Sequence, residues 1–156
     1  MLKRPLKIIS GGQTGADRAA LDVAIALGLD YGGAIPKVRI AEDGPLDSKY
    51  ENMTELDTPD YDARTEKNVL AADATLIFTD GILGGGSALT IEFAEKYNKP
   101  FLHIDFSVVA ENEAIRGVKE WLNKISPAVL NVAGSRKSTS KGIYEKVHNV
   151  LKSILN

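Results

Sequence analysis

The chain has 156 residues, of which 44% are hydrophobic and 26% are charged, and its formal net charge at pH 7 is −2. This length suits one globular domain with a buried core. The near-neutral charge argues against a broad electrostatic surface for nucleic acid or lipid. The lack of cysteine excludes disulfides, thiolate metal sites and a cysteine nucleophile. Residues 1–5 lead at once into an apolar strand too short for a signal peptide or membrane span, so we expect a cytoplasmic protein.

Short apolar runs alternate with helical patterns in the first part of the chain. Leu6–Ile9 is predicted as a strand, and residues 16–27 as a helix, because apolar residues recur there with the spacing of one helix face. A weaker strand is predicted over residues 31–35. The polar stretch that follows, residues 36–57, has no clear periodicity, and connections of this length are usually functional or mobile.

The second part of the chain continues the alternation. Thr58-Pro59-Asp60 has the composition of a helix start, with a hydroxyl N-cap, a proline at the first helical position and an acid in the first turn. Residues 74–79 form an almost unbroken apolar run, typical of a central strand. The remaining predictions are a helix ending near residue 72, a helix over 87–97, a strand over 101–105, a helix over 111–125, a strand over 128–132 and a helix from residue 142.

This alternation predicts an α/β fold, in which a doubly wound parallel sheet of about five strands is covered by helices on both faces. We expect residues 1–156 to form a single Rossmann-like ligand-binding domain with strand order 2-1-3-4-5. Ligands of such sheets bind at the carboxyl ends of the strands, where the winding direction reverses. In this order the first and third strands flank that point, and each leads into a glycine-rich loop.

The first glycine loop, residues 10–15, reads Ser-Gly-Gly-Gln-Thr-Gly. Its glycines either make a tight corner or bring backbone N–H groups at a helix start against an anion. The spacing of Thr14 and Asp17 also fits a capping box, which would be purely structural. The pattern is neither the dinucleotide fingerprint nor a P-loop. The ligand-binding candidates here are Gly11, Gly12, Gln13, Thr14, Gly15 and Asp17.

The second glycine loop, residues 84–87, reads Gly-Gly-Gly-Ser and opens a predicted helix. A single corner does not require three glycines in series, so Gly84, Gly85, Gly86, Ser87 and the nearby Thr90 are ligand-binding candidates. Glu92 lies in the first two turns of the helix. It is either a surface charge stabilised by the helix dipole or a carboxylate that holds a sugar hydroxyl or acts as a general acid–base.

Other polar residues follow the strands or share a helix face. Lys37 and Arg39 either close over an anion or belong to a solvated loop. Arg64 and Asn68 are four positions apart and therefore lie on one face of a helix. Asp80, at the tip of the 74–79 strand, is a candidate for binding a ribose or a pterin donor group.

Residues 135–138, Ser-Arg-Lys-Ser, follow the last predicted strand and either add positive charge to the site or form a solvated turn. Asp17, Asp80 and Glu92 are acidic, but their spacing is not diagnostic of a cation site. The two histidines are isolated and are predicted to be structural. No metal site is predicted.

Five blocks of the sequence together resemble the "putative molybdenum carrier" family: SGGQTGADRAALD, IPKVRIAEDGPL, RTEKNV, TLIF and GGGSALTIEFA. That family belongs to a wider group of Rossmann-like domains that includes the LONELY GUY phosphoribohydrolases and the DNA-processing Smf proteins. The resemblance runs from about Ile8 to the end of the chain. It implies a Rossmann-like fold and a nucleotide-like or pterin-phosphate ligand, with the molybdenum cofactor or a nucleotide as the candidates.

The phosphoribohydrolases carry the motif P-G-G-x-G-T-x-x-E, which binds phosphate and presents a glutamate to the ribose. The present chain keeps Gly85, Gly86 and Glu92 of this motif and departs from it at three other positions.

The sequence therefore leads to a first hypothesis and an alternative. The first is a carrier or binding protein that holds an anionic small molecule, a nucleotide-like ligand or molybdenum cofactor or molybdate, between the two glycine loops. The alternative is an N-glycosidic or phosphoribosyl hydrolase of nucleoside monophosphates that uses Glu92 with Arg64. Analogy with relatives suggests a homodimer or higher homo-oligomer. Neither nucleic acid nor a membrane is an expected partner, because the net charge is low.

Overall fold

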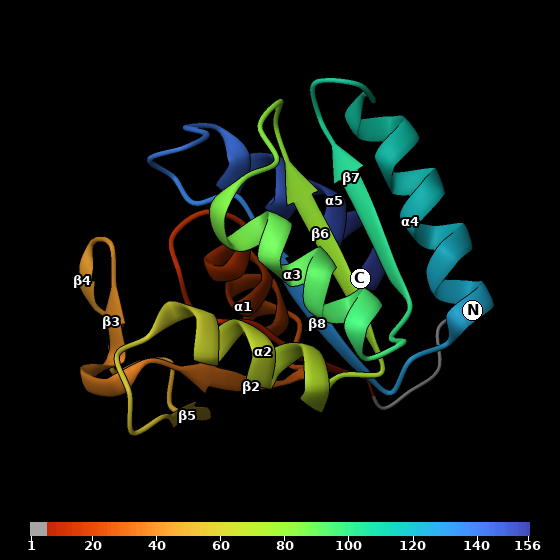
Figure 1. Cartoon of the computed structure of the whole chain (residues 1–156). Helices are drawn as coiled ribbons and strands as arrows, with labels where there is room; N and C mark the ends of the chain where they lie inside the picture. Colours follow the sequence, from red (N-terminus) through yellow and green to blue (C-terminus); the bar gives the residue numbers. More distant parts are fainter. Residues whose placement is uncertain (1–5) are drawn as a thin grey trace.

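A computed structural model describes residues 6–156 (Figure 1). Residues 1–5, which entered the expectation about the N-terminus, lie outside the described part. The parallel strands are β1 (Lys7–Ile9), β2 (Asp30–Ile35), β5 (Met53–Glu55), β6 (Ala74–Thr79), β7 (Phe101–Asp105) and β8 (Val129–Gly134). The helices are α1 (Ala16–Ala26), α2 (Tyr61–Ala71), α3 (Gly85–Lys96), α4 (Glu111–Ile125) and α5 (Ile143–Leu155).

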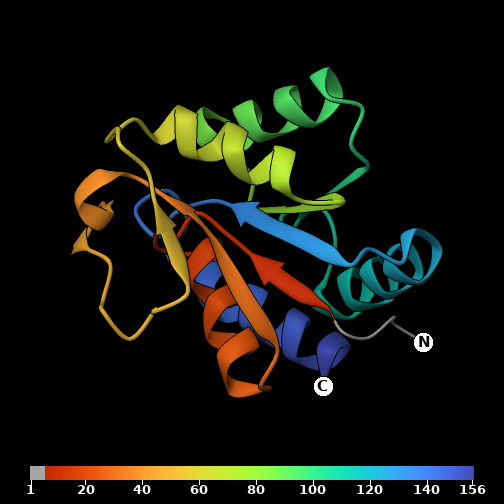
Figure 2. The ribbon, with the colours of Figure 1, turned by 90° about the horizontal axis from the view of Figure 1, so that it is seen from below.

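The structure has three layers. Helices α1, α4 and α5 pack on one face of the sheet, and α2 and α3 pack together on the other (Figure 2). The predicted α/β Rossmann-like fold is confirmed, with six strands rather than about five. The additional strand is β5, which comes from the stretch without periodicity and pairs with β2 at the sheet edge. No helix within residues 6–156 is long and apolar enough to cross a membrane.

The strand order is β5-β2-β1-β8-β6-β7, so the predicted order 2-1-3-4-5 is wrong. The last strand, β8, lies in the middle of the sheet between β1 and β6 instead of at an edge. If β8 and α5 are counted first, one half of the chain winds outward through β1, β2 and β5, and the other through β6 and β7. The winding direction therefore reverses between β8 and β6, which is where ligands bind in such folds.

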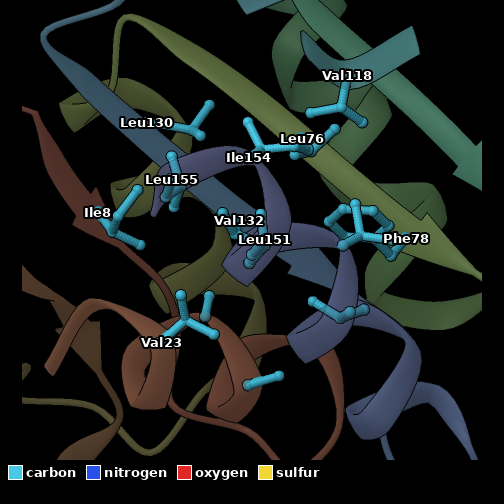
Figure 3. Close-up of a cluster of buried hydrophobic side chains, with 14 of the residues drawn as sticks. Ile8, Val23, Leu76, Phe78, Val118, Leu130, Val132, Leu151, Ile154 and Leu155 are labelled. Atoms are coloured by element: carbon cyan, nitrogen blue, oxygen red, sulfur yellow. The ribbon is translucent and has the colours of Figure 1, made fainter. Parts of the chain in front are cut away.

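The two faces of the sheet differ in polarity. The face under α1, α4 and α5 carries the main hydrophobic core (Figure 3), whose burial supplies most of the driving force for folding. The opposite face contains buried polar side chains: Asn68 exchanges two hydrogen bonds with the backbone of Ala34, and Asn131 donates to Thr75 Oγ1 at 3.3 Å. The labelled core residues are Ile8, Val23, Leu76, Phe78, Val118, Leu130, Val132, Leu151, Ile154 and Leu155.

The polar stretch 36–57 is ordered by a few contacts. It forms a short 3₁₀ turn, η1 (Lys37–Arg39), and a hairpin of β3 (Ile40–Ala41) and β4 (Gly44–Pro45), here called hairpin 40–45. Arg39 donates from its guanidinium to the carbonyls of Leu46, Asp47 and Tyr50, at 3.0–3.1 Å. Arg39 therefore stabilises the conformation of this segment through hydrogen bonds within the segment.

Two predicted helix starts are shifted. Helix α2 begins at Tyr61, and its N-cap is Asp60, whose carboxylate accepts from Asp62 N at 2.9 Å. Thr58 instead accepts Asp60 N–H through its hydroxyl and Lys37 N–H through its carbonyl, so it forms the turn before the helix. Helix α3 begins at Gly85, two residues before the predicted start, so the glycines form its first turn.

Candidate functional site

A cavity of about 430 Å³ opens at the carboxyl ends of β1, β8 and β6, where the winding of the sheet reverses. Its walls come from four segments: the first glycine loop, α2, residues 82–90 with the second glycine loop, and the loop after β8. The lining residues are Gly11, Gln13, Asp17, Arg64, Thr65, Asn68, Ile82, Gly84, Gly85, Gly86, Ser87, Thr90, Asn131, Ala133, Gly134, Ser135, Arg136, Ser138 and Thr139.

Arg64 is the buried cation of this cavity. It comes from α2, donates to Gly11 O at 2.7 Å, lies 3.6 Å from Asp17 Oδ2 and stacks on the Tyr61 ring. A Cβ on Gly11 would lie 2.3 Å from Arg64 Nη1. Glycine at position 11 therefore makes room for the guanidinium.

Asp17 is a buried carboxylate on α1 at the same cavity. Burial raises the pKa of Asp17, while Arg64 and the N–H of Gln13, which donates to Oδ2 at 3.3 Å, act to lower it. The capping-box interpretation of Thr14 is wrong, because no side chain caps the start of α1. The Thr14 hydroxyl instead donates to Glu42 and accepts the N–H of Lys137.

The first glycine loop is largely closed by the protein itself. Gly15 has φ +81°, and a Cβ there would lie 2.3 Å from Ser135 O, so glycine is required by backbone packing. Most of the surrounding amides donate within the protein: Gly12 N to Ser10 Oγ, Gln13 N to Asp17 Oδ2, Thr14 N to Gln13 Oε1 and Ala16 N to Ser135 O.

The second glycine loop is open. Within residues 6–156, the amides of Gly84, Gly85 and Gly86 have no hydrogen-bond acceptor, and these residues are exposed. A Cβ on Gly85 or Gly86 would meet nothing within 4 Å. These amides form the N-terminus of α3, where unpaired N–H groups and the helix dipole favour an anion.

Gln13 adds a buried, unpaired donor. It is 6% exposed, and its Oε1 accepts from the backbone of Thr14 at 3.1 Å and of Glu42 at 2.8 Å. These two donors identify the carbonyl end of the amide, so the other end is Nε2. Nε2 is buried and has no partner among the described residues, and Gln13 lines the cavity.

Hairpin 40–45 contacts the rim of the cavity through the Glu42 side chain. The Glu42 carboxylate accepts from the Thr14 hydroxyl and from Ser138 N (3.1 Å) and Oγ (2.6 Å), and it lies 3.8 Å from Arg136 Nη1. Burial acts to raise the pKa of Glu42, but the hydrogen bonds from Ser138 and Thr14 hold it below its usual value. Next to it, Asp43 forms a two-point ion pair with Arg18.

The structure brings most of the predicted candidates to the cavity and leaves others outside it. The Arg39 guanidinium donates to backbone carbonyls of its own loop, and Lys37 is exposed. Asp80 forms an ion pair with Lys146 at 2.9 Å. The predicted residues that line the cavity are Gly11, Gln13, Asp17, Arg64, Asn68, Gly84, Gly85, Gly86, Ser87 and Thr90; those outside it are Gly12, Thr14, Gly15, Lys37, Arg39, Asp80 and Glu92.

Sequence reasoning did not select three polar lining residues, Thr65, Asn131 and Thr139. Thr65 is next to the chosen Arg64, whereas Asn131 interrupts an apolar strand, which is a signal for a polar site at the strand's carboxyl end. The loop after β8 lines the cavity through Ser135, Arg136, Ser138 and Thr139, and residues 137–139 of it form an exposed turn, so each of the two expectations holds in part.

Glu92 lies in a neighbouring hollow of about 460 Å³ between α2 and α3. Arg64, Gly85, Gly86 and Arg136 border both this hollow and the main cavity. Within the described part of the chain, no group of three or more His, Cys, Asp or Glu residues could hold a metal ion.

Fold and cavity together define a Rossmann-like protein with a small-molecule cavity at the reversal of its sheet. Residues 8–155 match the model of the "Circularly permutated YpsA SLOG family", and the chain belongs to this family. The permutation in that description agrees with a sheet whose central strand comes last in the chain.

One similar solved structure is the crystal structure of a "Putative molybdenum carrier protein" from Syntrophus aciditrophicus. It shares 49% sequence identity with this chain and has a TM-score of 0.93, and the match covers 96% of this chain and 94% of the other. A search of curated proteins found no match. The resemblance stated from the sequence blocks is thereby confirmed.

Proposed function

We propose that this chain, acting as one ligand-binding domain, is a carrier for an anionic small molecule of the nucleotide or molybdenum-cofactor class. The observation that carries the proposal is the open N-terminus of α3: Gly84, Gly85 and Gly86 have amides without an acceptor in the described chain, and they line the same cavity as Arg64. The name of the Syntrophus aciditrophicus relative supports the molybdenum-cofactor class. The anionic group of the ligand binds at the second glycine loop and not between two equal loops.

The size of the cavity favours a ligand with an organic ring. Its volume of about 430 Å³ lies within the range of roughly 300–1,000 Å³ found for small-molecule sites. A molybdate ion alone would fill only a small part of it. The polar side chains Ser87 and Asn131 line the cavity and offer hydrogen bonds to the remainder of a larger ligand.

The direct test is the stability of the chain with nucleoside monophosphates, molybdate and molybdopterin, each followed by thermal or urea unfolding. A ligand at 100 times its Kd stabilises the folded state by about 2.7 kcal/mol. We expect such a shift with a ring-bearing phosphate and a much smaller one with molybdate. Native mass spectrometry of freshly purified protein should show a bound phosphate ester. The absence of any shift and of any bound molecule contradicts the proposal.

One observation favours a second candidate function, the hydrolysis of nucleoside monophosphates. Glu92 and Arg64 border the same hollow, and Gly85 and Gly86 lie between that hollow and the main cavity. Such an enzyme releases free base, and Glu92→Gln should abolish the release without changing the affinity for the nucleotide. Release that continues undiminished in Glu92→Gln excludes this role for Glu92.

A further inference from the structure

The main cavity and the neighbouring hollow between α2 and α3 share a border. Their volumes are about 430 and 460 Å³, and each lies within the range of roughly 300–1,000 Å³ found for small-molecule sites. The residues that line both are Arg64, Thr65, Gly85, Gly86 and Arg136. The border therefore combines two guanidinium groups with the open N-terminus of α3, and a ligand seated there contacts both spaces.

Arg64 keeps one donor available at this border. Its side chain is 9% exposed, and Nε donates to Tyr61 O at 3.4 Å and Nη1 to Gly11 O at 2.7 Å. Nη2 donates to no group within residues 6–156, and it is not among the buried atoms that lack a partner, so it retains contact with solvent. A cation that the protein already holds in place binds an anion with little loss of conformational freedom.

Arg136 supplies the second cation, from the loop after β8. Its guanidinium lies 5.6 Å from the centre of the Tyr61 ring, and the guanidinium of Arg64 lies 5.3 Å from the same centre. The two cations therefore gather at one aromatic ring although they come from distant parts of the chain. Two guanidinium groups beside unpaired amides suit an anion with more than one phosphate group.

The part of the hollow beyond the border is acidic. The residues that line the hollow and not the main cavity are Tyr61, Asp62, Ala88, Leu89 and Glu92. Ionised carboxylates accept hydrogen bonds from hydroxyl groups, and they repel a further phosphate group. Asp62 and Glu92 therefore favour a neutral group that is rich in hydroxyls.

We propose that the ligand is a nucleoside diphosphate whose β-phosphate carries a sugar. The nucleoside occupies the main cavity, the two phosphates lie at the border beside Arg64 and Arg136, and the sugar hydroxyls donate to carboxylates in the hollow. This inference rests on the proposed function, because the N-terminus of α3 holds the phosphates in both. It selects the nucleotide class and assigns the hollow to the second end of the ligand.

Three series of nucleotides test the inference by isothermal titration of the full chain without divalent cations: AMP, ADP and ADP-glucose; UMP, UDP and UDP-glucose; GMP, GDP and GDP-mannose. In the series whose base binds best, the diphosphate should have at least about a tenfold lower Kd than the monophosphate, because it gains charge-assisted contacts. The sugar should lower the Kd at least about threefold further. The matching triphosphate should bind more weakly than the diphosphate, because its third phosphate would face Asp62 and Glu92.

Glu92→Ala separates the two ends of the ligand. It should raise the Kd of the nucleotide sugar about threefold to tenfold and leave that of the nucleoside monophosphate unchanged. Glu95→Ala is the matched control, because Glu95 is an exposed carboxylate on the same helix that lines neither space. It should change neither Kd. An unchanged affinity of Glu92→Ala for the nucleotide sugar, or equal losses for both ligands, overturns the inference.

The wild-type chain provides a second readout that needs no variant. Relative to the monophosphate, the saturating nucleotide sugar should shift the backbone amides of Ala88 and Leu89 in a ¹⁵N NMR spectrum. A nucleotide sugar that binds no more tightly than the monophosphate in every series, or binding of molybdopterin alone, overturns this inference and leaves the proposed function standing. No binding of any of these nucleotides or of molybdopterin overturns both.

Discussion

The two glycine loops follow strands of the same sheet and precede helices on opposite faces of it, but they differ in their packing and in the hydrogen bonds of their amides. In the first loop, Gly15 allows the backbone to touch Ser135 O, and most of the amides donate to groups of the protein. In the second loop, no atom lies within 4 Å of a Cβ built on Gly85 or Gly86, and the amides have no acceptor in the described chain.

This difference shows that a glycine-rich strand-to-helix loop does not identify a ligand site by itself. The two informative quantities are the space that a Cβ would enter and the partners of the backbone N–H groups. By both criteria the first loop is closed by packing within the protein and supports Gln13 and Arg64. The second loop is open, which agrees with the proposal that it binds an anion. The following variants separate these two roles.

Arg64→Ala should have the largest effect, because Arg64 joins the first loop to the cavity. The change removes the bond to Gly11 O and leaves the buried Asp17 without its cation. Breaking a buried pair on one side costs about 3–5 kcal/mol of unfolding free energy. Urea unfolding at neutral pH measures this loss. The loss should be clearly smaller in an Asp17→Asn background, and an equal loss in both backgrounds contradicts the pairing.

Gly15→Ala should destabilise the chain by about 2–5 kcal/mol, because alanine at φ +81° is strained and its Cβ would collide with Ser135 O. The matched change Gly86→Ala should leave the unfolding free energy within about 1 kcal/mol or raise it. Gly86→Ala should instead weaken phosphate-ligand binding about tenfold. Similar losses of stability in both variants contradict the contrast between the loops.

Glu42→Ala should cost about 1–2 kcal/mol, because its carboxylate holds the rim through Thr14, Ser138 and Arg136 in charge-assisted hydrogen bonds near solvent. Asp43→Ala removes a more exposed ion pair with Arg18 and should cost less than about 1 kcal/mol. Chemical denaturation of both variants tests the order, and a larger loss for Asp43→Ala reverses it.

The effect of Asp17→Asn on stability should depend on pH. Burial raises the folded-state pKa of Asp17 above its unfolded value, so its contribution to stability is full below the unfolded pKa and is lost as pH rises through the folded pKa. The free energy of unfolding of the Asn variant, taken relative to that of wild type, should therefore rise between pH 4 and neutral pH. Unfolding curves across this range measure the difference; one that grows on acidification is inconsistent with a raised pKa.

The sequence predicted the class of fold because the alternation of elements is strong, but it did not predict the position of β8. Neighbours in sequence are usually neighbours in a sheet, and this tendency placed the last strand at an edge. The burial of Leu130, Asn131 and Val132 on β8 is the physical sign of a central strand. The short strand β5 has too few residues to show a periodic pattern.

Residues of the candidate site were predictable from the sequence where their relative positions depend on a single helix or strand. The spacing of Arg64 and Asn68 placed both on one helix face, and the structure directs both to the cavity. The role of Arg39 depends on carbonyls 7 to 11 positions away, whose directions the sequence does not encode. The same holds for Thr14, because its partner Glu42 comes from hairpin 40–45.

The most direct test of the account is a titration of the ¹⁵N-labelled chain with inorganic phosphate, followed by backbone amide shifts. We expect saturable shifts at residues 84–87, much smaller ones at Gly12 and Thr14, and saturation only at clearly higher phosphate concentration in Gly86→Ala. Saturable shifts at Gly12 and Thr14 with none at residues 84–87 would contradict it.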